Sequence, residues 1–186
     1  MMCGKLELII GPMFSGKSTE LIRRIRMLQK IDKKVLVTKP IIDNRYISDK
    51  ITSHNYESVE CKVLSRLDEI SDEEITNYDT IVVDEGQFFP DLLTTVIRWI
   101  DNYPISIIVG GLDGDFQRQP IGQILNLIPH ADKCQKLNSL CSKCKDGTEA
   151  SFSFRCVNSN DKVLVGGSES YIPVCRKHYL ELNRFK

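Results

Sequence analysis

The sequence predicts an α/β fold, in which helices cover both faces of a parallel β-sheet, followed by a small C-terminal part of different construction. Three observations lead to this class. Short apolar runs alternate with amphipathic helical segments up to residue 132, a glycine-containing turn joins the first run to the first helix, and cysteine pairs follow once the alternation has ended. We therefore take the elements in chain order.

The first half of the expected sheet begins with the apolar run 6–10, which ends at Gly11 and predicts a buried strand and a turn. Residues 18–30 have apolar side chains at the spacing of an amphipathic helix, with arginines on other faces. The run 35–37 predicts a second strand. Residues 41–60 are polar and irregular, which predicts a loop region.

The second half contains a β-branched strand at 80–84 that is apolar up to its acidic end, a helix at 92–103 and a strand at 105–109 that two glycines stop. None of these strands alternates with polar residues, which is typical of a parallel sheet covered on both faces. Because the alternation ends at residue 132, we expect an α/β domain at 1–132 and a smaller domain at 133–186, to which the motifs described next assign a phosphate-binding loop (P-loop) and a zinc site, respectively.

Composition excludes several classes of protein. The 186 residues suffice for one ordinary domain with a small appendage. Lys plus Arg and Asp plus Glu each number 25, so bulk electrostatic binding to nucleic acid is not expected. The sequence contains no apolar run of about 18 residues, so no membrane-spanning helix is predicted. The odd count of seven cysteines and the lack of a signal-peptide pattern predict a reducing, cytoplasmic location.

The turn after the first strand fits the phosphate-binding pattern G-x-x-x-x-G-K-[ST] at every fixed position. Its residues are Gly11, Pro12, Met13, Phe14, Ser15, Gly16, Lys17 and Ser18. Successive backbone N–H groups and the start of the next helix bind phosphate, Lys17 reaches the β- and γ-phosphates, and the Ser18 hydroxyl ligates Mg²⁺. A chance match in a glycine-containing turn is the alternative, but the preceding strand and following helix favour a nucleoside triphosphate site.

Two carboxylates end the strand at 80–84. In a parallel sheet ligands gather at the carboxyl ends of strands, so Asp84 is placed to hold Mg²⁺. Glu85 is expected near the γ-phosphate, where a carboxylate can take a proton from an attacking hydroxyl. Water or an alcohol could supply that hydroxyl, so the pair fits an ATPase as well as a kinase. An exposed acidic pair without a role is the alternative.

Two ligand pairs follow the end of the alternation. Cys141 and Cys144 are spaced C-x₂-C, and Cys175 and His178 are spaced C-x₂-H. Three cysteines and one histidine match tetrahedral structural zinc, which would join two distant turns in a segment poor in large apolar side chains. Unrelated surface cysteines are the alternative. The other cysteines, at 3, 61, 134 and 156, lack paired spacing and are interpreted as small apolar residues.

Taken together, these motifs resemble the cytosolic-type, zinc-containing thymidine kinase family. The resemblance runs from about residue 5 to 179 in the family's order. It is carried by the segments 11–21 (GPMFSGKSTEL), 84–91 (DEGQFFPD) and 112–118 (LDGDFQR), the Cys-x₂-Cys pair, and the closing Gly166, Gly167, Tyr171, Cys175 and Arg176. His178 departs from many members, which have cysteine there; imidazole also binds zinc.

The resemblance implies an enzyme that transfers the γ-phosphate of ATP to the 5′-hydroxyl of thymidine, for nucleotide salvage and DNA precursor synthesis. It implies Mg²⁺, structural zinc in the small C-terminal domain, and a loop of that domain, the lasso, that closes over the nucleoside. It further implies a cytoplasmic homotetramer that thymidine triphosphate inhibits, with no nucleic-acid or membrane partner.

Residue roles are implied in the same way. Glu85 matches the general base, Asp84 and Asp43 match residues around magnesium, and Arg45 matches an arginine that faces the phosphates. Without the resemblance, Asp43 and Arg45 read equally well as a surface ion pair.

The nucleoside pocket implied by the resemblance has apolar walls and a few backbone donors and acceptors. Its walls are Met13, Phe88, Leu112 and Phe116; the polar edge of the base is read around Ser153, Val163, Leu164 and Val165; and Tyr171 packs against the nucleoside. In most sequences such aromatic residues and methionines would be plain core residues.

Two other functions remain open. A P-loop ATPase or helicase-like motor would use Glu85 to activate water, and a zinc-knuckle module would bind nucleic acid. The short chain and the balanced charge weigh against both. The cluster Arg23, Arg24 and Arg26 is interpreted as a solvated helix face or a subunit contact.

Overall fold

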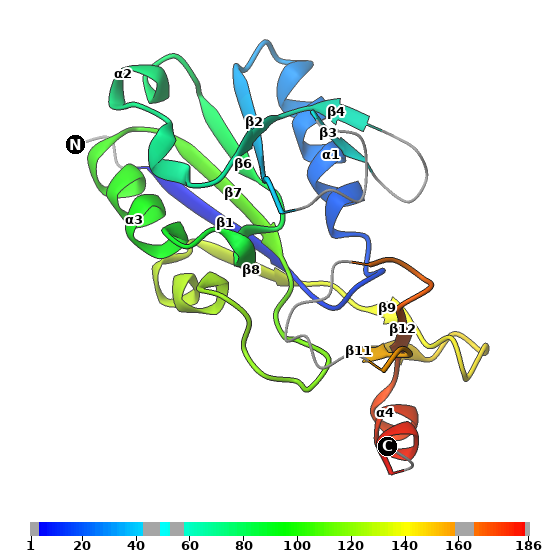
Figure 1. Ribbon diagram of the computed structural model, residues 1–186. Coiled ribbons are helices and arrows are strands. Elements are labelled where there is room, and N and C mark those ends of the chain that lie inside the picture. The colour runs from blue at the N-terminus through cyan, green and yellow to red at the C-terminus, as the bar shows by residue number, and fades with distance from the viewer. Residues whose placement is uncertain (1–3, 43–48, 53–57, 159–165, 185–186) are drawn as a thin grey trace.

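A six-stranded parallel sheet forms the centre of the computed structural model, which describes residues 4–42, 49–52, 58–158 and 166–184. The strand order is β5-β2-β6-β7-β1-β8, and every neighbouring pair is parallel (Figure 1). The strands are β1 (Lys5–Ile10), β2 (Val35–Pro40), β5 (Lys62–Leu64), β6 (Thr80–Val83), β7 (Ser106–Gly111) and β8 (Lys133–Lys136). The predicted α/β class with a parallel sheet is therefore confirmed.

Apolar side chains cover both faces of this sheet, as the lack of polar alternation predicts. Leu6 and Leu8 of β1 point into a core that contains Trp99 of α3 (Leu92–Asn102), while Ile9 points to the opposite face. There it joins Leu21 and two isoleucines of α1 (Lys17–Gln29). The remaining short helices are η1 (Leu67–Glu69), α2 (Asp72–Ile75), η2 (Gly86–Phe88) and η3 (Ile124–His130). No helix within the described ranges combines the length and apolarity that a membrane crossing requires.

The loop predicted at 41–60 is in part a β-hairpin. Strands β3 (Lys50–Thr52) and β4 (Ser58–Glu60) pair antiparallel. Ile51 is 2% exposed and packs in the same core as α1. Each strand has only three residues, so a single inward-facing apolar side chain among polar neighbours does not produce the alternating pattern that predicts a strand. The prediction of an irregular loop is wrong for these residues.

The C-terminal part has small two-stranded sheets and one helix. Its elements are β9 (Ser139–Leu140), β10 (Glu149–Ala150), β11 (Phe152–Arg155), β12 (Tyr171–Val174) and α4 (Arg176–Asn183). They surround a core of few apolar side chains, among them Phe154 and Val174. In Figure 1 this part lies below the carboxyl end of β1, and α4 projects furthest from the large sheet. β8, which opens the predicted segment 133–186, pairs with β1 in the large sheet.

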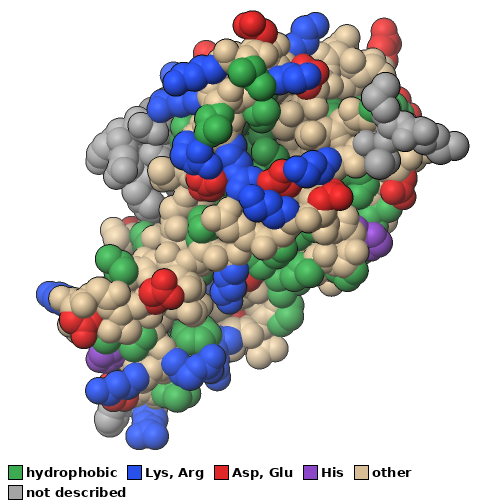
Figure 2. Space-filling model, turned by 180° about the vertical axis from the view of Figure 1, so that it is seen from behind, with side chains coloured by type: hydrophobic (Ala, Val, Ile, Leu, Met, Phe, Trp, Pro, Cys, Tyr) green, Lys and Arg blue, Asp and Glu red, His purple; other side chains and the backbone are tan. Residues whose placement is uncertain are grey.

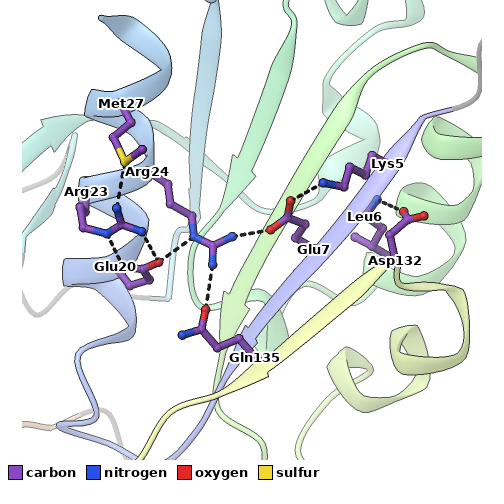
Figure 3. A network of polar contacts seen from close by, with 9 residues as sticks. All are labelled: Lys5, Leu6, Glu7, Glu20, Arg23, Arg24, Met27, Asp132 and Gln135. Atoms are coloured by element: carbon purple, nitrogen blue, oxygen red, sulfur yellow. Dashed lines mark hydrogen bonds and ion pairs between the residues drawn. The ribbon is translucent and has the colours of Figure 1, made fainter.

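A polar network fixes α1 to the edge of the sheet (Figure 3). The Arg24 guanidinium donates to Glu20 on its own helix, to Glu7 on β1 and to Gln135 on β8, at 2.8, 2.5 and 2.8 Å. Arg23 also donates to Glu20 at 2.6 Å. On the face drawn in Figure 2, acidic side chains are interspersed among the basic ones. Arg23 and Arg24 therefore make hydrogen bonds within the molecule, and a role of this helix face in a subunit contact stays a prediction.

Candidate active site and metal centre

The phosphate-binding loop lies between the carboxyl end of β1 and the start of α1. Gly16, the residue before the helix, has a φ of 82°, a left-handed conformation that glycine adopts without steric cost. The carbonyl of Pro12 accepts hydrogen bonds from Lys17 Nζ at 2.7 Å and from Ser15 Oγ at 2.8 Å. The loop thus holds its lysine, which is 7% exposed, next to the first turn of a 13-residue helix. Such a helix start favours bound anions.

The acidic end of β6 lies against this loop. Ser18 Oγ donates to Asp84 Oδ2 at 3.3 Å, and the backbone N–H of Glu85 donates to Asp84 Oδ1 at 3.0 Å. Asp84 and Glu85 are 4% and 7% exposed. A hydroxyl and a carboxylate this close together are oxygen ligands of the kind Mg²⁺ binds in phosphate sites. Of the residues that the sequence proposes around magnesium, the structure thus brings together Ser18 and Asp84, the two that it describes.

Glu85 has an unusual backbone and a defined hydrogen-bond partner. Its φ is 49°, in the left-handed region that non-glycine residues seldom enter. Gln87 Nε2 donates to Glu85 Oε2 at 2.5 Å, and the backbone N–H of Leu112 donates to Gln87 Oε1 at 3.0 Å. No role for Gln87 was predicted from the sequence. Its position two residues after the proposed base is the sequence feature that could have indicated a contact with Glu85.

Four of the predicted pocket residues lie where the two parts of the chain adjoin. The backbone N–H of Met13 donates to Ser153 Oγ at 3.0 Å, which joins the phosphate-binding loop to β11. The Arg155 guanidinium lies 3.7 Å from the centre of the Phe116 ring and donates to the Tyr171 hydroxyl at 2.9 and 3.2 Å. Arg155 is 2% exposed, and the sequence analysis did not single it out.

The other predicted wall residues lie in segments that follow strands of the large sheet. Phe88 lies in η2 and is half-buried, and Leu112 directly follows β7. The sequence-proposed Asp43, Arg45, Val163, Leu164 and Val165 lie outside the described residues. Their roles stay predictions.

The four proposed zinc ligands form one cluster. The ligand atoms of Cys141, Cys144, Cys175 and His178 all lie within 4.8 Å of one another. The Cys144 and Cys175 sulfurs are 3.8 Å apart, and His178 Nδ1 lies 3.3 to 3.6 Å from the three sulfurs. Tetrahedral zinc with bonds of about 2.3 Å to sulfur and 2.0 Å to nitrogen gives edges of about 3.8 and 3.5 Å. The donor set and its spacing fit zinc.

Charge at the cluster also fits a cation. Burial raises the pKa of the Cys141 thiol, but backbone N–H groups, that of Cys175 foremost, outweigh it and lower the pKa to about 6. Burial and the neighbouring Cys141 sulfur raise the pKa of Cys144 to about 11. One thiolate is therefore favoured and a second is opposed unless a positive charge lies between them.

The cluster of Cys141, Cys144, Cys175 and His178 is connected to the predicted pocket residue Phe116 through Tyr179, the residue after His178 on α4. The Tyr179 hydroxyl donates to the Phe116 carbonyl at 2.8 Å. The Arg118 guanidinium lies 4.6 Å from the centre of the Tyr179 ring, and Phe152 packs against the same ring at 5.4 Å. The segment that follows β7 is thus held by the helix that provides His178.

Comparison with known proteins agrees with this arrangement. A family model described as thymidine kinase matches residues 4–179. The thymidine kinase of vaccinia virus (strain Western Reserve) is 44% identical over 184 residues, covering 96% of this chain and 98% of the viral protein. Thymidine kinase 1 of Dictyostelium discoideum is 42% identical over 183 residues, covering 95% of this chain and 78% of that protein. The chain belongs to the thymidine kinase family.

Proposed function

We propose that this chain transfers the γ-phosphate of ATP to the 5′-hydroxyl of thymidine, giving thymidine 5′-monophosphate and ADP. The observation that carries the proposal is the placement of a buried Glu85 beside Asp84, which the phosphate-binding loop contacts through Ser18. Family membership then selects a nucleoside hydroxyl over water as the acceptor. It also favours the kinase over the two alternatives that the sequence left open.

In the proposed reaction, the loop 11–18 binds the phosphates through its backbone N–H groups and Lys17. Glu85 takes the proton of the 5′-hydroxyl as its oxygen attacks the γ-phosphorus and the bond to the ADP oxygen breaks. Arg45 is proposed to face the transferred group. Ser18, Asp84 and Asp43 would hold Mg²⁺, which neutralises phosphate charge.

The nucleoside is proposed to lie where the two parts of the chain adjoin. Met13 and Ser153 are hydrogen-bonded to each other there, and Phe116 and Tyr171 are joined by Arg155. Phe88 and Leu112 would complete the apolar wall, and the backbone at 163–165 would read the polar edge of the base. Apolar walls with few polar contacts suit an uncharged pyrimidine nucleoside.

We extend the proposal to the organisation of the protein. Zinc at Cys141, Cys144, Cys175 and His178 would staple the C-terminal part, since a ligand set with no open position is structural. The division into a domain at 1–132 and a zinc domain at 133–186, a cytoplasmic homotetramer, and inhibition by thymidine triphosphate are proposed from the family resemblance.

The acceptor specificity of ATP turnover tests the proposed function. ADP release is measured with ATP and Mg²⁺ in the presence of thymidine, without an acceptor, and with single-stranded DNA. We expect turnover that depends on thymidine. Equal turnover without an acceptor would indicate an ATPase, and stimulation by DNA alone would indicate a nucleic-acid-dependent motor; both contradict the proposal.

A further inference from the structure

Gln87 makes two hydrogen bonds that the function described so far does not use. Its side chain is 4% exposed and lies between the proposed base and the segment that follows β7. Nε2 donates to Glu85 Oε2 at 2.5 Å, and Oε1 accepts from the backbone N–H of Leu112 at 3.0 Å. The amide therefore connects Glu85 with a residue proposed to line the nucleoside pocket.

The direction of the amide follows from its partners. The backbone N–H of Leu112 can only donate, so the atom facing it is the amide oxygen. The amide nitrogen must then face Glu85, where an ionised carboxylate can only accept. Both partners are thus satisfied by one orientation of Gln87, and the flipped amide would leave a buried donor facing a donor and an acceptor facing an acceptor.

The fold leaves room for this side chain at one specific place. A Cβ atom added at Gly111 would lie 2.2 Å from Gln87 Oε1, a distance that real Cβ atoms do not reach. Glycine at the last position of β7 is therefore required for the amide to reach the N–H of Leu112. The position of the Gln87 amide therefore depends on the space beside Gly111 as well as on its two hydrogen bonds.

We propose that Gln87 is a positioning residue for phosphoryl transfer: it fixes the carboxylate of Glu85 and couples it to the Leu112 wall of the nucleoside pocket. This inference rests on the proposed function. The bond at Oε2 restricts rotation of the carboxylate, so the base holds one orientation toward the acceptor hydroxyl. Because Oε1 also holds the Leu112 backbone, the base and the pocket wall keep a fixed separation.

Two substitutions separate the two hydrogen bonds. Gln87→Glu keeps an oxygen for the Leu112 N–H but replaces the N–H donor to Glu85 with a carboxyl oxygen, which repels the ionised base. Gln87→Met has similar length and removes both. We expect kcat to fall about 10- to 100-fold in both, as for other misplaced catalytic groups. The KM for thymidine should stay within about twofold in Gln87→Glu and rise in Gln87→Met, since only the latter frees the Leu112 backbone.

A double-mutant cycle tests whether Gln87 acts through Glu85. Thymidine-dependent ADP release is measured for wild type, Glu85→Gln, Gln87→Met and the double variant, with Glu85→Gln/Gln87→Glu as a second double variant should Gln87→Met fold poorly. Binding stoichiometry for thymidine corrects each rate for the folded, binding-competent fraction. Gln123→Met is the matched control, because Gln123 Oε1 likewise accepts a backbone N–H, that of Leu93, at 3.0 Å.

If Gln87 works by holding the base, removing it costs kcat in wild type and almost nothing once Glu85 is already glutamine. Gln123→Met should leave kcat unchanged. An equal loss of kcat in both backgrounds overturns the inference and leaves the proposed function standing. No thymidine-dependent turnover by the wild type overturns the proposed function, and the inference with it.

Discussion

Glu85 combines burial, a left-handed backbone and a fixed hydrogen-bond donor in one residue. It is 7% exposed, has a φ of 49° and accepts from Gln87. A non-glycine residue in this region costs free energy, of order 1–3 kcal/mol, and such residues concentrate at functional sites. The one-turn helix η2 begins directly after it.

Glu85→Gln should separate catalysis from binding. The amide keeps the shape of the side chain but cannot accept a proton, so kcat is expected to fall about 100- to 10,000-fold. Affinities for ATP and thymidine, measured by calorimetry, should stay near wild type. Glu73→Gln, at an exposed position of α2, is the matched control and should leave kcat unchanged. An unchanged kcat in Glu85→Gln would remove Glu85 from the role of base.

Residue roles were predictable where a motif fixes both residue type and spacing. The pattern of the loop at 11–18 and the acidic end of the strand at 80–84 each predict an oxygen or nitrogen ligand from local sequence. The hydrogen bond between Ser18 and Asp84 shows that the two side chains lie together, and their roles as ligands stay predictions. Arg155 was not predictable, because its partner Phe116 is brought close only by the fold. For Gln87, the sequence indicates the closeness to Glu85 but not the second partner, Leu112, which the fold brings close.

At the scale of elements, α1 is held by a charged network as well as by its apolar face. Arg24 lies between Glu20 and Glu7, with Gln135 of β8 as a third partner. The hydrogen bonds of Arg23 and then Arg24 lower the pKa of Glu20 to about 2. The helix that begins at the phosphate-binding loop is therefore tied to the sheet by ionised groups.

The stability provided by Glu20 should depend on pH. Its folded-state pKa lies below the ordinary value of 4.5, so the interaction stabilises fully above that value and is lost as the pH falls toward 2. At pH 7, Glu20→Gln should lower the free energy of unfolding by about 1 kcal/mol. Urea unfolding from pH 7 to pH 3 should show this difference shrinking. A difference that stays constant or grows on acidification would contradict the assignment.

Helix α4 is expected to control the segment that follows β7 through Tyr179. Tyr179→Phe removes the hydroxyl that donates to the Phe116 carbonyl and keeps the ring under Arg118. The KM for thymidine should rise about three- to tenfold with zinc content unchanged, because the pocket wall loses one anchor. Steady-state kinetics and metal analysis measure the two effects. A KM equal to wild type would show that this bond does not position the pocket.

Elements were predictable where an apolar run or a helical period was long enough. The strands expected at 6–10, 35–37, 80–84 and 105–109 correspond to β1, β2, β6 and β7. The strands β3, β4 and β5 have three residues each, too few for a pattern. β8 is an edge strand of lysines, cysteine and glutamine, and pairing with β1 holds it in the sheet despite its polar composition.

At the scale of the whole molecule, the proposed site lies between the large sheet and a small C-terminal part that contains the four proposed zinc ligands. The C-terminal core has few apolar side chains, and two of its buried members are Cys141 and Tyr179. Below a certain size, an apolar core needs a metal or a disulfide to stay folded. Because we propose that the nucleoside lies at the junction of the two parts, near Met13, Ser153 and Phe116, we expect zinc binding to support substrate binding.

Cys144→Ala should lower zinc content and destabilise the C-terminal part. Removing one of four ligands weakens metal binding, and in small metal sites the free energy of metal binding stabilises the fold. We therefore expect the free energy of unfolding to fall by about 3 kcal/mol or more. Zinc analysis and thermal unfolding measure it. Cys156→Ala is the matched control, at an exposed cysteine outside the cluster, and should retain zinc. A fully loaded, equally stable Cys144→Ala would refute the ligand assignment.

Thymidine analogues that lack one hydroxyl test directly whether the 5′-hydroxyl accepts the γ-phosphate. ATP and Mg²⁺ are incubated with the enzyme and thymidine, 3′-deoxythymidine or 5′-deoxythymidine, and ADP and nucleotide products are quantified together. We expect ADP and nucleoside 5′-monophosphate in equal amounts with thymidine and with 3′-deoxythymidine. With 5′-deoxythymidine, which lacks the hydroxyl that Glu85 would deprotonate, no product is expected. ADP formation with 5′-deoxythymidine at the rate seen with thymidine would contradict phosphoryl transfer to the 5′-hydroxyl.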